Sequence, residues 1–288
     1  MNDNEIEILG TEPQPDNSGK RRTALLVGIL VLIAAIVVVL ILLLRQNGKQ
    51  ANQEATNNAQ EGEIEEVATD TKATVDTFCV RYIMNSSSPA DTLLRVFKPG
   101  AASVELLISK DYDTNDASVI FATQAANLKA EDGGIIGDFV YKGTTLAQGC
   151  ADSTTLGFCA IVNNKVILGK ANPTNYLDST ISSKGFFYRH YCYVTGNGPE
   201  VFSNSAKSYR RAICIISNKD VAVVESYGRM SMTDFAQALY DNDITLAVGL
   251  MGSKNLDEWY RTDSSRTVIY QNPYGPNPNR NYLIFRKK

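Results

Sequence analysis

The residues best suited to binding chemistry are two arginines in the C-terminal half of the chain. Arg210 begins the apolar run 210–216, and Arg229 ends the tripeptide Tyr227-Gly228-Arg229. A guanidinium offers N–H donors in a fixed fork and pairs with phosphate or carboxylate groups. The two arginines therefore indicate an anion-binding capacity, whereas ion pairing at strand ends is the structural alternative.

The single histidine limits the catalytic chemistry available to the chain. His190 lies in an aromatic strand, where alternation places Phe186, Tyr188 and His190 on one face. A Ser-His-Asp triad would need His190, but the sequence has no GxSxG elbow, and neither a P-loop nor GxGxxG occurs. One histidine also excludes HExxH and other multi-histidine metal sites. We predict no metal and no cofactor, and a structural role for His190 with a catalytic role as the alternative.

The cysteine pattern matches no zinc site and contains no CxxC motif. Cys192 and Cys214 fall within apolar strands, where a small buried thiol is the simplest interpretation. Cys150 and Cys159 flank an eight-residue loop. In an oxidising compartment these two residues could form a disulfide, and two free thiols are the alternative.

Residues 23–44 form an apolar run long enough to cross a membrane. The run has 22 residues without a charge, and 17 of them are Leu, Ile or Val. A bilayer core needs about 20 apolar helical residues. The apolar part of a secretory signal is shorter, about 7–15 residues, and ends in small residues, whereas this run ends in Leu44-Arg45. We therefore predict an uncleaved transmembrane helix whose partner is the lipid bilayer.

Charge predicts the orientation of this helix. Lys20, Arg21 and Arg22 directly precede the run, and only Arg45 and Lys49 follow it closely. The positive-inside rule places the more basic flank in the cytoplasm. The N-terminus is therefore predicted to be cytoplasmic, and the C-terminal domain periplasmic or extracellular.

Charge also divides the rest of the chain into three parts. The predicted cytoplasmic tail 1–22 carries a net charge of −2, and residues 45–76 carry −4. The total of −3 leaves +3 on residues 77–288, and the pI of about 5.4 argues against nucleic-acid binding. Residues 45–76 are rich in Asn, Gln, Glu, Ala and Thr and predict a flexible stalk. Residues 77–288 are long enough for one folded domain.

The folded domain is predicted to be α+β, dominated by short strands in mixed sheets. Asn163-Asn164 separates two apolar runs and is typical of a hairpin turn. One helix is expected over Ala90–Phe97, and a second begins at Ser231, which opens a capping box with Asp234. Residues 272–281 contain three prolines and a glycine and must form a loop.

The order of elements over residues 209–259 resembles the phosphodiester glycosidase family. That family has an Arg-Thr-Ala-Ile-Gly strand, a strand ending in Asp-Gly-Arg, a helix, and a strand ending in Leu-Asp-Gly-Gly-Gly-Ser. Here Arg210 and Ala212 fall on the first motif, and Tyr227-Gly228-Arg229 falls on the second. Leu250-Met251-Gly252-Ser253 falls on the last. The resemblance spans most of residues 105–262 and implies a phosphodiester-glycosidase-like domain.

Departures from the family pattern bear most directly on activity. Tyr227 and Met251 stand where the family has its two motif aspartates, and neither side chain replaces a carboxylate. An upstream Asn-Gly-Gly motif falls on Gln124-Ala125-Ala126, which places methyl groups where the family has bare backbone. The resemblance thus implies a ligand site without an assigned catalytic residue, made of Gln124, Arg210, Tyr227, Gly228, Arg229, Gly252 and Ser253.

Two functions from different classes follow from this pattern. The first is a catalytically degenerate domain on the outer face of the membrane that binds a glycan, a phosphate ester or a protein partner, or serves as a scaffold. The second is an active hydrolase of glycosyl phosphodiesters in cell-envelope glycans, with unconventional carboxylates at Glu225, Asp138 or Asp257. The loss of both motif aspartates favours the degenerate domain.

Overall fold

The computed structural model describes residues 64–68, 78–85, 91–149, 156–170, 174–217, 219–262 and 265–288. All of them belong to the compact unit Gln60–Lys288. The predicted tail 1–22, the predicted transmembrane run 23–44, most of the predicted stalk and Cys150 lie outside the described residues. Within the described ranges, no helix has the length and apolar character needed to span a bilayer.

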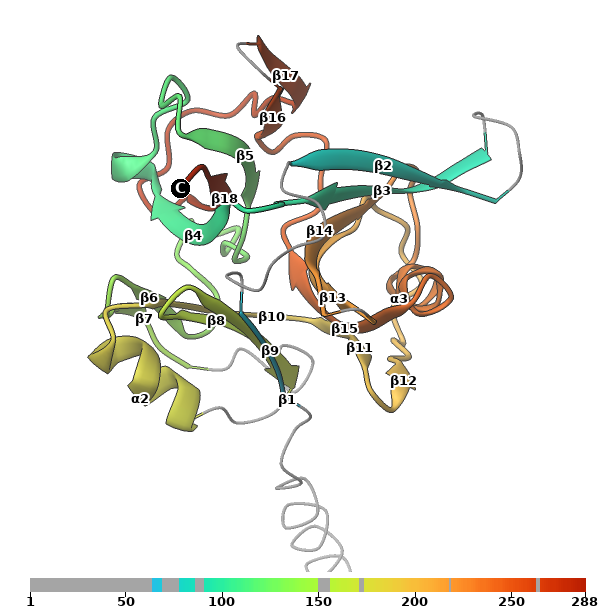
Figure 1. Ribbon diagram of the computed structural model, residues 1–288, viewed down its shortest axis with the longest axis horizontal. Coiled ribbons are helices and arrows are strands. Elements are labelled where there is room, and N and C mark those ends of the chain that lie inside the picture. The colour runs from blue at the N-terminus through green and yellow to red at the C-terminus, as the bar shows by residue number, and fades with distance from the viewer. Residues whose placement is uncertain are drawn as a thin grey trace, which may run out of the picture. The chain divides into compact units, whose positions relative to one another are not determined.

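The largest sheet of the described chain carries the segments of the predicted ligand site (Figure 1). Its strands in spatial order are β12 (Gly198–Pro199), β11 (Cys192–Thr195), β15 (Ile244–Leu250), β13 (Arg211–Ile216), β14 (Val221–Ser226), β3 (Thr92–Lys98) and β2 (Cys79–Met84). Helix α3 (Met232–Tyr240) covers one face, where Phe235 and Leu239 pack with Ala212 and Val224.

Two further sheets complete the described domain. One has the order β1 (Ile64–Ala68), β9 (Lys165–Lys170), β8 (Gly157–Val162), β10 (Phe186–His190), β6 (Phe139–Tyr141) and β7 (Thr144–Ala147), with helix α2 (Thr174–Ser182) packed against it. The other has the order β17 (Ser265–Tyr270), β16 (Glu258–Thr262), β5 (Val119–Gln124), β18 (Asn281–Arg286) and β4 (Ser103–Ile108), and a short 3-10 helix, η2 (Ser109–Asp111), follows β4.

Every strand pair among the described residues is antiparallel, so the expectation of mixed sheets is wrong for this part of the chain. The connection through α3 shows why. It leads from β14 to β15, but β15 pairs with the far side of β13 and not with β14 itself. The helical crossover therefore skips one strand and creates no parallel neighbour.

The helix predicted over Ala90–Phe97 is wrong, because β3 occupies most of this segment. β3 pairs with both β2 and β14, and its Val96 and Phe97 are buried. Pairing on both sides satisfies the backbone more fully than an isolated short helix would. β1 also departs from expectation. It lies inside the segment expected to be a flexible stalk, and it pairs with β9 of the folded domain.

The other local predictions are confirmed by the structure. Helix α3 begins after Ser231, whose hydroxyl accepts a hydrogen bond from the backbone N–H of Asp234 at 3.0 Å. Asn163 and Asn164 both have positive φ at the turn between β8 and β9, as a tight hairpin requires. The loop at residues 272–281 lies between the end of β17 and the start of β18.

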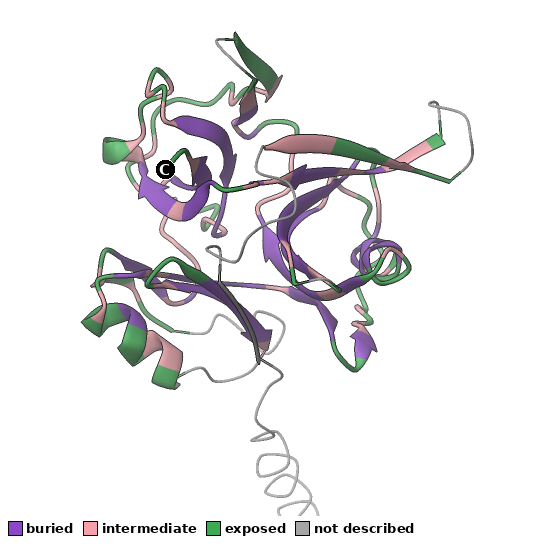
Figure 2. Cartoon of the chain, viewed as in Figure 1, coloured by how far each residue is buried: buried purple, intermediate pink, exposed green. Residues whose placement is uncertain are grey.

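A single apolar core joins the three sheets. It contains Phe139 and Cys159 from the β8 sheet, Ile213 from β13, and Phe121 and Phe285 from the β5 sheet. Figure 2 shows buried residues, in purple, on strands of all three sheets. The core positions the strand ends at which the predicted ligand residues lie.

Candidate functional site

The ends of β13, β14 and β15 that carry the predicted motifs lie side by side within the largest sheet. Arg211, which opens β13, lies opposite Glu225 near the end of β14 and opposite Leu250 at the end of β15. The backbone N–H of Met251 donates to the carbonyl of Ala125 at 2.9 Å, which brings in the segment after β5. The structure therefore gathers the segments that the sequence assigned to one site.

Two of the predicted ligand residues have structural roles. The guanidinium of Arg210 donates from Nε to the carbonyl of Met230 at 3.2 Å and from Nη2 to the carbonyl of Ala206 at 2.6 Å. Gly252 packs on the neighbouring backbone, because an added Cβ would lie 2.3 Å from the carbonyl oxygen of Tyr209. The side chain of Arg210 thus holds the segments at Ala206 and Met230 in place, and Gly252 allows two backbone segments to approach closely.

Of two further predicted ligand residues, Gln124 is buried and Ser253 takes part in a local turn. Gln124 is only 1% exposed, and its Oε1 has no hydrogen-bond partner among the described residues. Ala125 and Ala126 beside it are buried in the common core. The hydroxyl of Ser253 accepts a hydrogen bond from the backbone N–H of Asn255 at 3.1 Å, which closes a local turn.

The tripeptide Tyr227-Gly228-Arg229 is the part of the predicted site that faces solvent. Tyr227 is 45% exposed, and an added Cβ at Gly228 would meet no atom within 4 Å. Arg229 is exposed and forms no hydrogen bond or ion pair with the described residues. The ring of Tyr82 lies edge-on to that of Tyr227 at 6.2 Å. These side chains form an exposed aromatic and cationic surface.

A buried ionic cluster lies directly beneath this surface. Nη2 of Arg211 donates to Oε2 of Glu225 at 3.2 Å and to Oε2 of Glu258 at 2.7 Å. The side chains of Arg211, Glu225 and Glu258 are 1%, 3% and 0% exposed. Nη1 of Arg211 also donates to the carbonyl of Met251 at 2.8 Å, at the position of a lost motif aspartate.

Arg95 and Tyr270 connect the buried cluster to the surface. Nη1 of Arg95 lies 3.1 Å from Oε1 of Glu225, and its guanidinium carbon lies 5.3 Å from the centre of the Tyr227 ring. On the other side, the guanidinium carbon of Arg211 lies 5.9 Å from the ring of the half-buried Tyr270. The cluster therefore lies just below a rim of tyrosines.

Burial and charge shift the pKa values of this cluster in a consistent way. Burial, opposed by Arg211 and reinforced by Glu225, raises the pKa of Glu258 well above its ordinary value. Burial alone would lower the pKa of Arg211, but the carboxyl groups of Glu258 and Glu225 outweigh burial and raise it. Burial, with both carboxyl groups nearby, raises the pKa of Tyr270 to about 12. Arg211 is therefore charged and Tyr270 neutral at physiological pH.

The carboxylates named from the sequence are all engaged by other groups. Asp138 accepts from Nε of Arg189 at 2.6 Å and from the backbone N–H of Gly149 at 2.8 Å. Asp257 accepts from the backbone N–H of Asn272 at 2.9 Å and from the hydroxyl of Tyr282 at 3.2 Å. Glu225 lies in the buried cluster, so none of the three is a free carboxylate on the exposed surface.

His190, Cys159, Cys192 and Cys214 are buried. His190 is 3% exposed and its Nδ1 accepts the backbone N–H of Tyr191, and burial lowers its pKa to about 3. A neutral, enclosed imidazole fits the structural role. Burial raises the pKa of the Cys159 and Cys214 thiols, and Cys159 forms no disulfide in the structure. The described residues contain no group of three His, Cys, Asp or Glu side chains placed to hold a metal.

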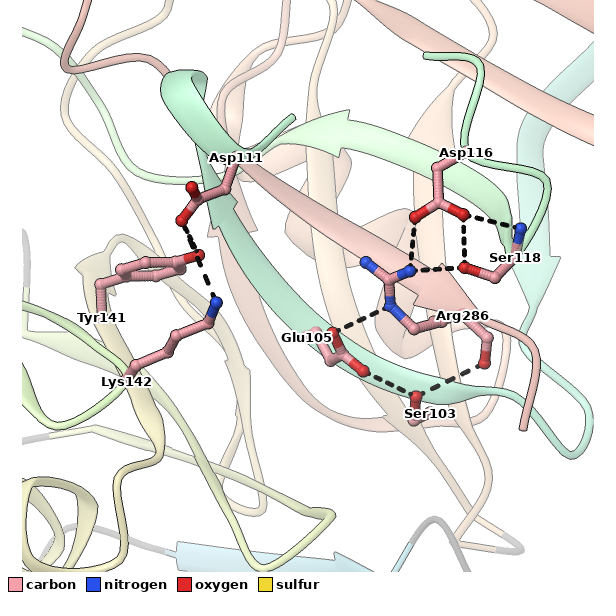
Figure 3. Close-up of polar contacts among 8 residues, drawn as sticks. All are labelled: Ser103, Glu105, Asp111, Asp116, Ser118, Tyr141, Lys142 and Arg286. Carbon is pink, nitrogen blue, oxygen red and sulfur yellow. Dashed lines mark hydrogen bonds and ion pairs between the residues drawn. The ribbon is translucent and has the colours of Figure 1, made fainter. Parts of the chain in front are cut away.

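A second cluster of one arginine and two carboxylates lies at the surface of the β18 sheet (Figure 3). Arg286 donates from Nε to Glu105 at 3.1 Å and from Nη1 to Asp116 at 2.6 Å. Their side chains are 26%, 27% and 34% exposed. Hydrogen bonds from Ser118, then Arg286, lower the pKa of Asp116 to about 2. This cluster provides an exposed counterpart to the one around Arg211.

The sequence pattern pointed to Glu225 but not to Arg211, Glu258 or Arg95. A signal for Arg211 was present, because period-two alternation puts it on the same face as Ile213 and Ile215, which are core residues. A charge on an apolar strand face predicts a buried partner. No local pattern identifies Glu258 as that partner, because it comes from a different sheet.

The comparisons with known proteins concern the fold. No family model matches the sequence, and no curated protein matches it. The auto-inhibited catalytic domain of zebrafish N-acetylglucosamine-1-phosphodiester alpha-N-acetylglucosaminidase (NAGPA) is similar, with a TM-score of 0.55, 10% identity, and coverage of 79% of this chain and 88% of that chain. A hypothetical protein from Synechocystis has a TM-score of 0.46 at 12% identity, covering 73% of this chain and 62% of that chain.

The similarity to the zebrafish enzyme defines the class of fold. The described domain is strand-dominated and shares its fold, distantly, with a phosphodiester glycosidase catalytic domain. The resemblance stated from the sequence motifs is therefore confirmed for the fold.

Proposed function

We propose that the C-terminal domain is a catalytically degenerate relative of phosphodiester glycosidases that binds a glycan or a phosphate ester without hydrolysing it. We further propose that residues 23–44 anchor it in a membrane, with the domain periplasmic or extracellular and the N-terminus cytoplasmic. The fold likeness to the zebrafish enzyme supports the choice of ligand class.

The observation that carries this proposal is the state of the carboxyl groups. Cleavage of a glycosyl phosphodiester needs carboxyl groups that reach the anomeric carbon and its leaving oxygen. Tyr227 and Met251 replace the two motif aspartates. Glu225 and Glu258 are buried against Arg211. Without an accessible acid and base at these strand ends, the domain can bind a ligand but cannot cleave it.

Binding is assigned to the exposed surface above the cluster. Arg229 offers a free guanidinium for a phosphate oxygen or a sugar hydroxyl. Tyr227 and Tyr82 offer aromatic surface for the apolar face of a sugar ring, and Gly228 between them and Arg229 leaves the backbone open. The overall charge of +3 on residues 77–288 is compatible with an anionic ligand.

One observation favours the active hydrolase as the second candidate. Glu225 and Glu258 share a single nitrogen of Arg211, and the pKa of Glu258 is raised above that of an ordinary carboxyl group. A carboxyl group whose pKa is raised can act as a general acid. Hydrolysis would require the ligand to reach these groups past Tyr270.

A chromogenic sugar phosphodiester tests the two candidates on the full chain. We expect no turnover and saturable binding, weakened about tenfold or more in Arg229→Ala because a charge-assisted hydrogen bond is lost. Lys110→Ala, which removes an exposed cation on η2 beside the edge strand β4 of another sheet, is the control and should bind normally.

Other outcomes would change the assignment. Turnover that Glu258→Gln abolishes would replace the binding proposal with the hydrolase. Absence of both turnover and binding would contradict both candidates and leave the domain a scaffold.

A further inference from the structure

The two carboxyl groups of the buried cluster are compensated unequally. Glu225 faces two cations, with Oε2 on Arg211 and Oε1 on Arg95. Among the described residues, Glu258 forms one ion pair, with Arg211, through the same Nη2 atom that also serves Glu225, and Arg95 acts on Glu258 only from a greater distance. The Oε1 atoms of Glu258 and Glu225 are both buried without a hydrogen-bond partner among the described residues, but Oε1 of Glu225 lies 3.1 Å from Nη1 of Arg95. Glu258 is therefore the less stabilised anion of the pair.

No described residue around Glu258 other than Arg211 forms an ion pair with it, and Arg95 lowers the pKa of Glu258 only from a greater distance. Glu258 opens β16, where it lies opposite Thr123 of β5 and Tyr270 of β17. Both neighbours carry neutral hydroxyl groups, since burial and the two carboxyl groups hold Tyr270 protonated. Arg95 on β3 is engaged with Glu225 on β14, and Arg211 on β13 is shared. Two adjacent anions in a buried site repel strongly.

We infer that this cluster is a proton-binding site, in which Glu258 holds one proton at neutral pH and shares it with Glu225 through a hydrogen bond. A proton between the two carboxyl groups removes their repulsion, and Arg95 and Arg211 then compensate the remaining charge on Glu225. The raised pKa of Glu258, caused first by burial, agrees with this arrangement. The inference is independent of ligand binding.

The bound proton ties two sheets together. Glu258 belongs to the β16 sheet, whereas Arg211 and Glu225 belong to the largest sheet. Removal of the proton places a second, poorly compensated charge at this junction, next to Tyr270. Rising pH is therefore expected to weaken the attachment of the β16–β17 hairpin, while acid pH preserves it.

The sign of the pH dependence follows from proton linkage. The pKa of Glu258 is raised in the folded chain, so the folded state binds more protons than the unfolded state above the ordinary value of 4.5. The stabilisation is complete below that value and is lost as pH rises toward the folded pKa. One extra proton in the folded state changes the unfolding constant by about tenfold per pH unit.

Urea unfolding of the full chain and of Glu258→Gln at several pH values tests the proton site. The amide keeps the shape of a protonated carboxyl without titrating. We expect the unfolding constant of the wild-type chain to rise relative to that of Glu258→Gln, by up to about tenfold per pH unit above 4.5. Glu105→Gln, which alters the exposed cluster, should show no such rise. If the ratio of the wild-type unfolding constant to that of Glu258→Gln stays constant or falls as pH rises, the inference is overturned.

Infrared spectroscopy gives a second measurement that does not depend on the variant folding. The wild-type chain at neutral pH should show the C=O stretching band of a protonated carboxyl group, because ordinary Asp and Glu side chains are ionised there. Glutamate labelled with ¹³C at the carboxyl carbon should shift that band. A spectrum without a protonated glutamate band at neutral pH would refute the proton site.

Discussion

The clusters around Arg211 and Arg286 contain the same chemical groups in different surroundings. Each arginine lies between two carboxylates at distances between 2.6 and 3.2 Å. Arg211 and its partners are at most 3% exposed, whereas Arg286 and its partners are 26–34% exposed. The pKa of Glu258 is raised by burial, whereas that of Asp116 is lowered by hydrogen bonds. Burial therefore decides the charge state of Glu258, whereas hydrogen bonds from Ser118 and Arg286 keep Asp116 ionised.

The contrast also predicts different energetic roles for the two clusters. A buried ion pair contributes little net stability over an apolar replacement but is costly to break on one side. The Arg211 cluster lies beside Met251, at the strand ends that carry the motif segments. In this chain the ends of these strands are linked by the ion pairs of Arg211, and the tripeptide Tyr227-Gly228-Arg229 is exposed.

The largest expected effect comes from Arg211→Ala. It leaves Glu225 and Glu258 buried without their shared donor, and breaking a buried pair from one side costs about 3–5 kcal/mol. Urea unfolding at neutral pH measures the loss. A loss below about 1 kcal/mol would place this cluster in the same energetic class as a surface pair and remove the contrast.

A smaller effect is expected when the backbone beside the buried cluster is displaced. In Gly252→Ala the new Cβ would lie 2.3 Å from the carbonyl of Tyr209, next to the Met251 carbonyl that Arg211 binds. Overpacking of this kind costs about 1–3 kcal/mol. Gly275→Ala, where a Cβ meets no atom within 4 Å, is the control. Equal thermal stability of the two variants would show that the close approach is not required.

Arg286→Ala should have the smallest effect on stability. Water can solvate Glu105 and Asp116 when their partner is lost, so the expected cost is about 0.2–1 kcal/mol and falls at high salt. Unfolding at low and high ionic strength checks both points. A loss comparable to that of Arg211→Ala would contradict the role assigned to solvent.

The sequence predicted the features that depend on local pattern. Ser231 specified the start of α3, Asn163-Asn164 specified a hairpin, and the motif order identified the fold. The helix predicted over Ala90–Phe97 failed because tertiary pairing with β2 and β14 outweighs local propensity.

The site was predictable only in part for a similar reason. The motif segments do converge, but the functional state of their residues depends on partners from distant strands. Glu258 and Arg95 meet Glu225 and Arg211 only in the folded sheets. No spacing along the chain indicates that a carboxylate named as a candidate acid is already neutralised.

The most direct test compares the pH dependence of one acid from each cluster. The free energy of unfolding should be measured from acid to alkaline pH for the wild-type chain, Glu258→Gln and Asp116→Asn. We predict opposite signs. Loss of Asp116 should destabilise the chain at neutral pH and have no effect as pH falls to about 2, because its pKa is lowered in the folded state. Glu258→Gln should gain stability over the wild type as pH rises above 4.5. If both substitutions changed the free energy of unfolding with pH in the same direction, this would contradict the claim that the buried Arg211 cluster holds a proton and links two sheets.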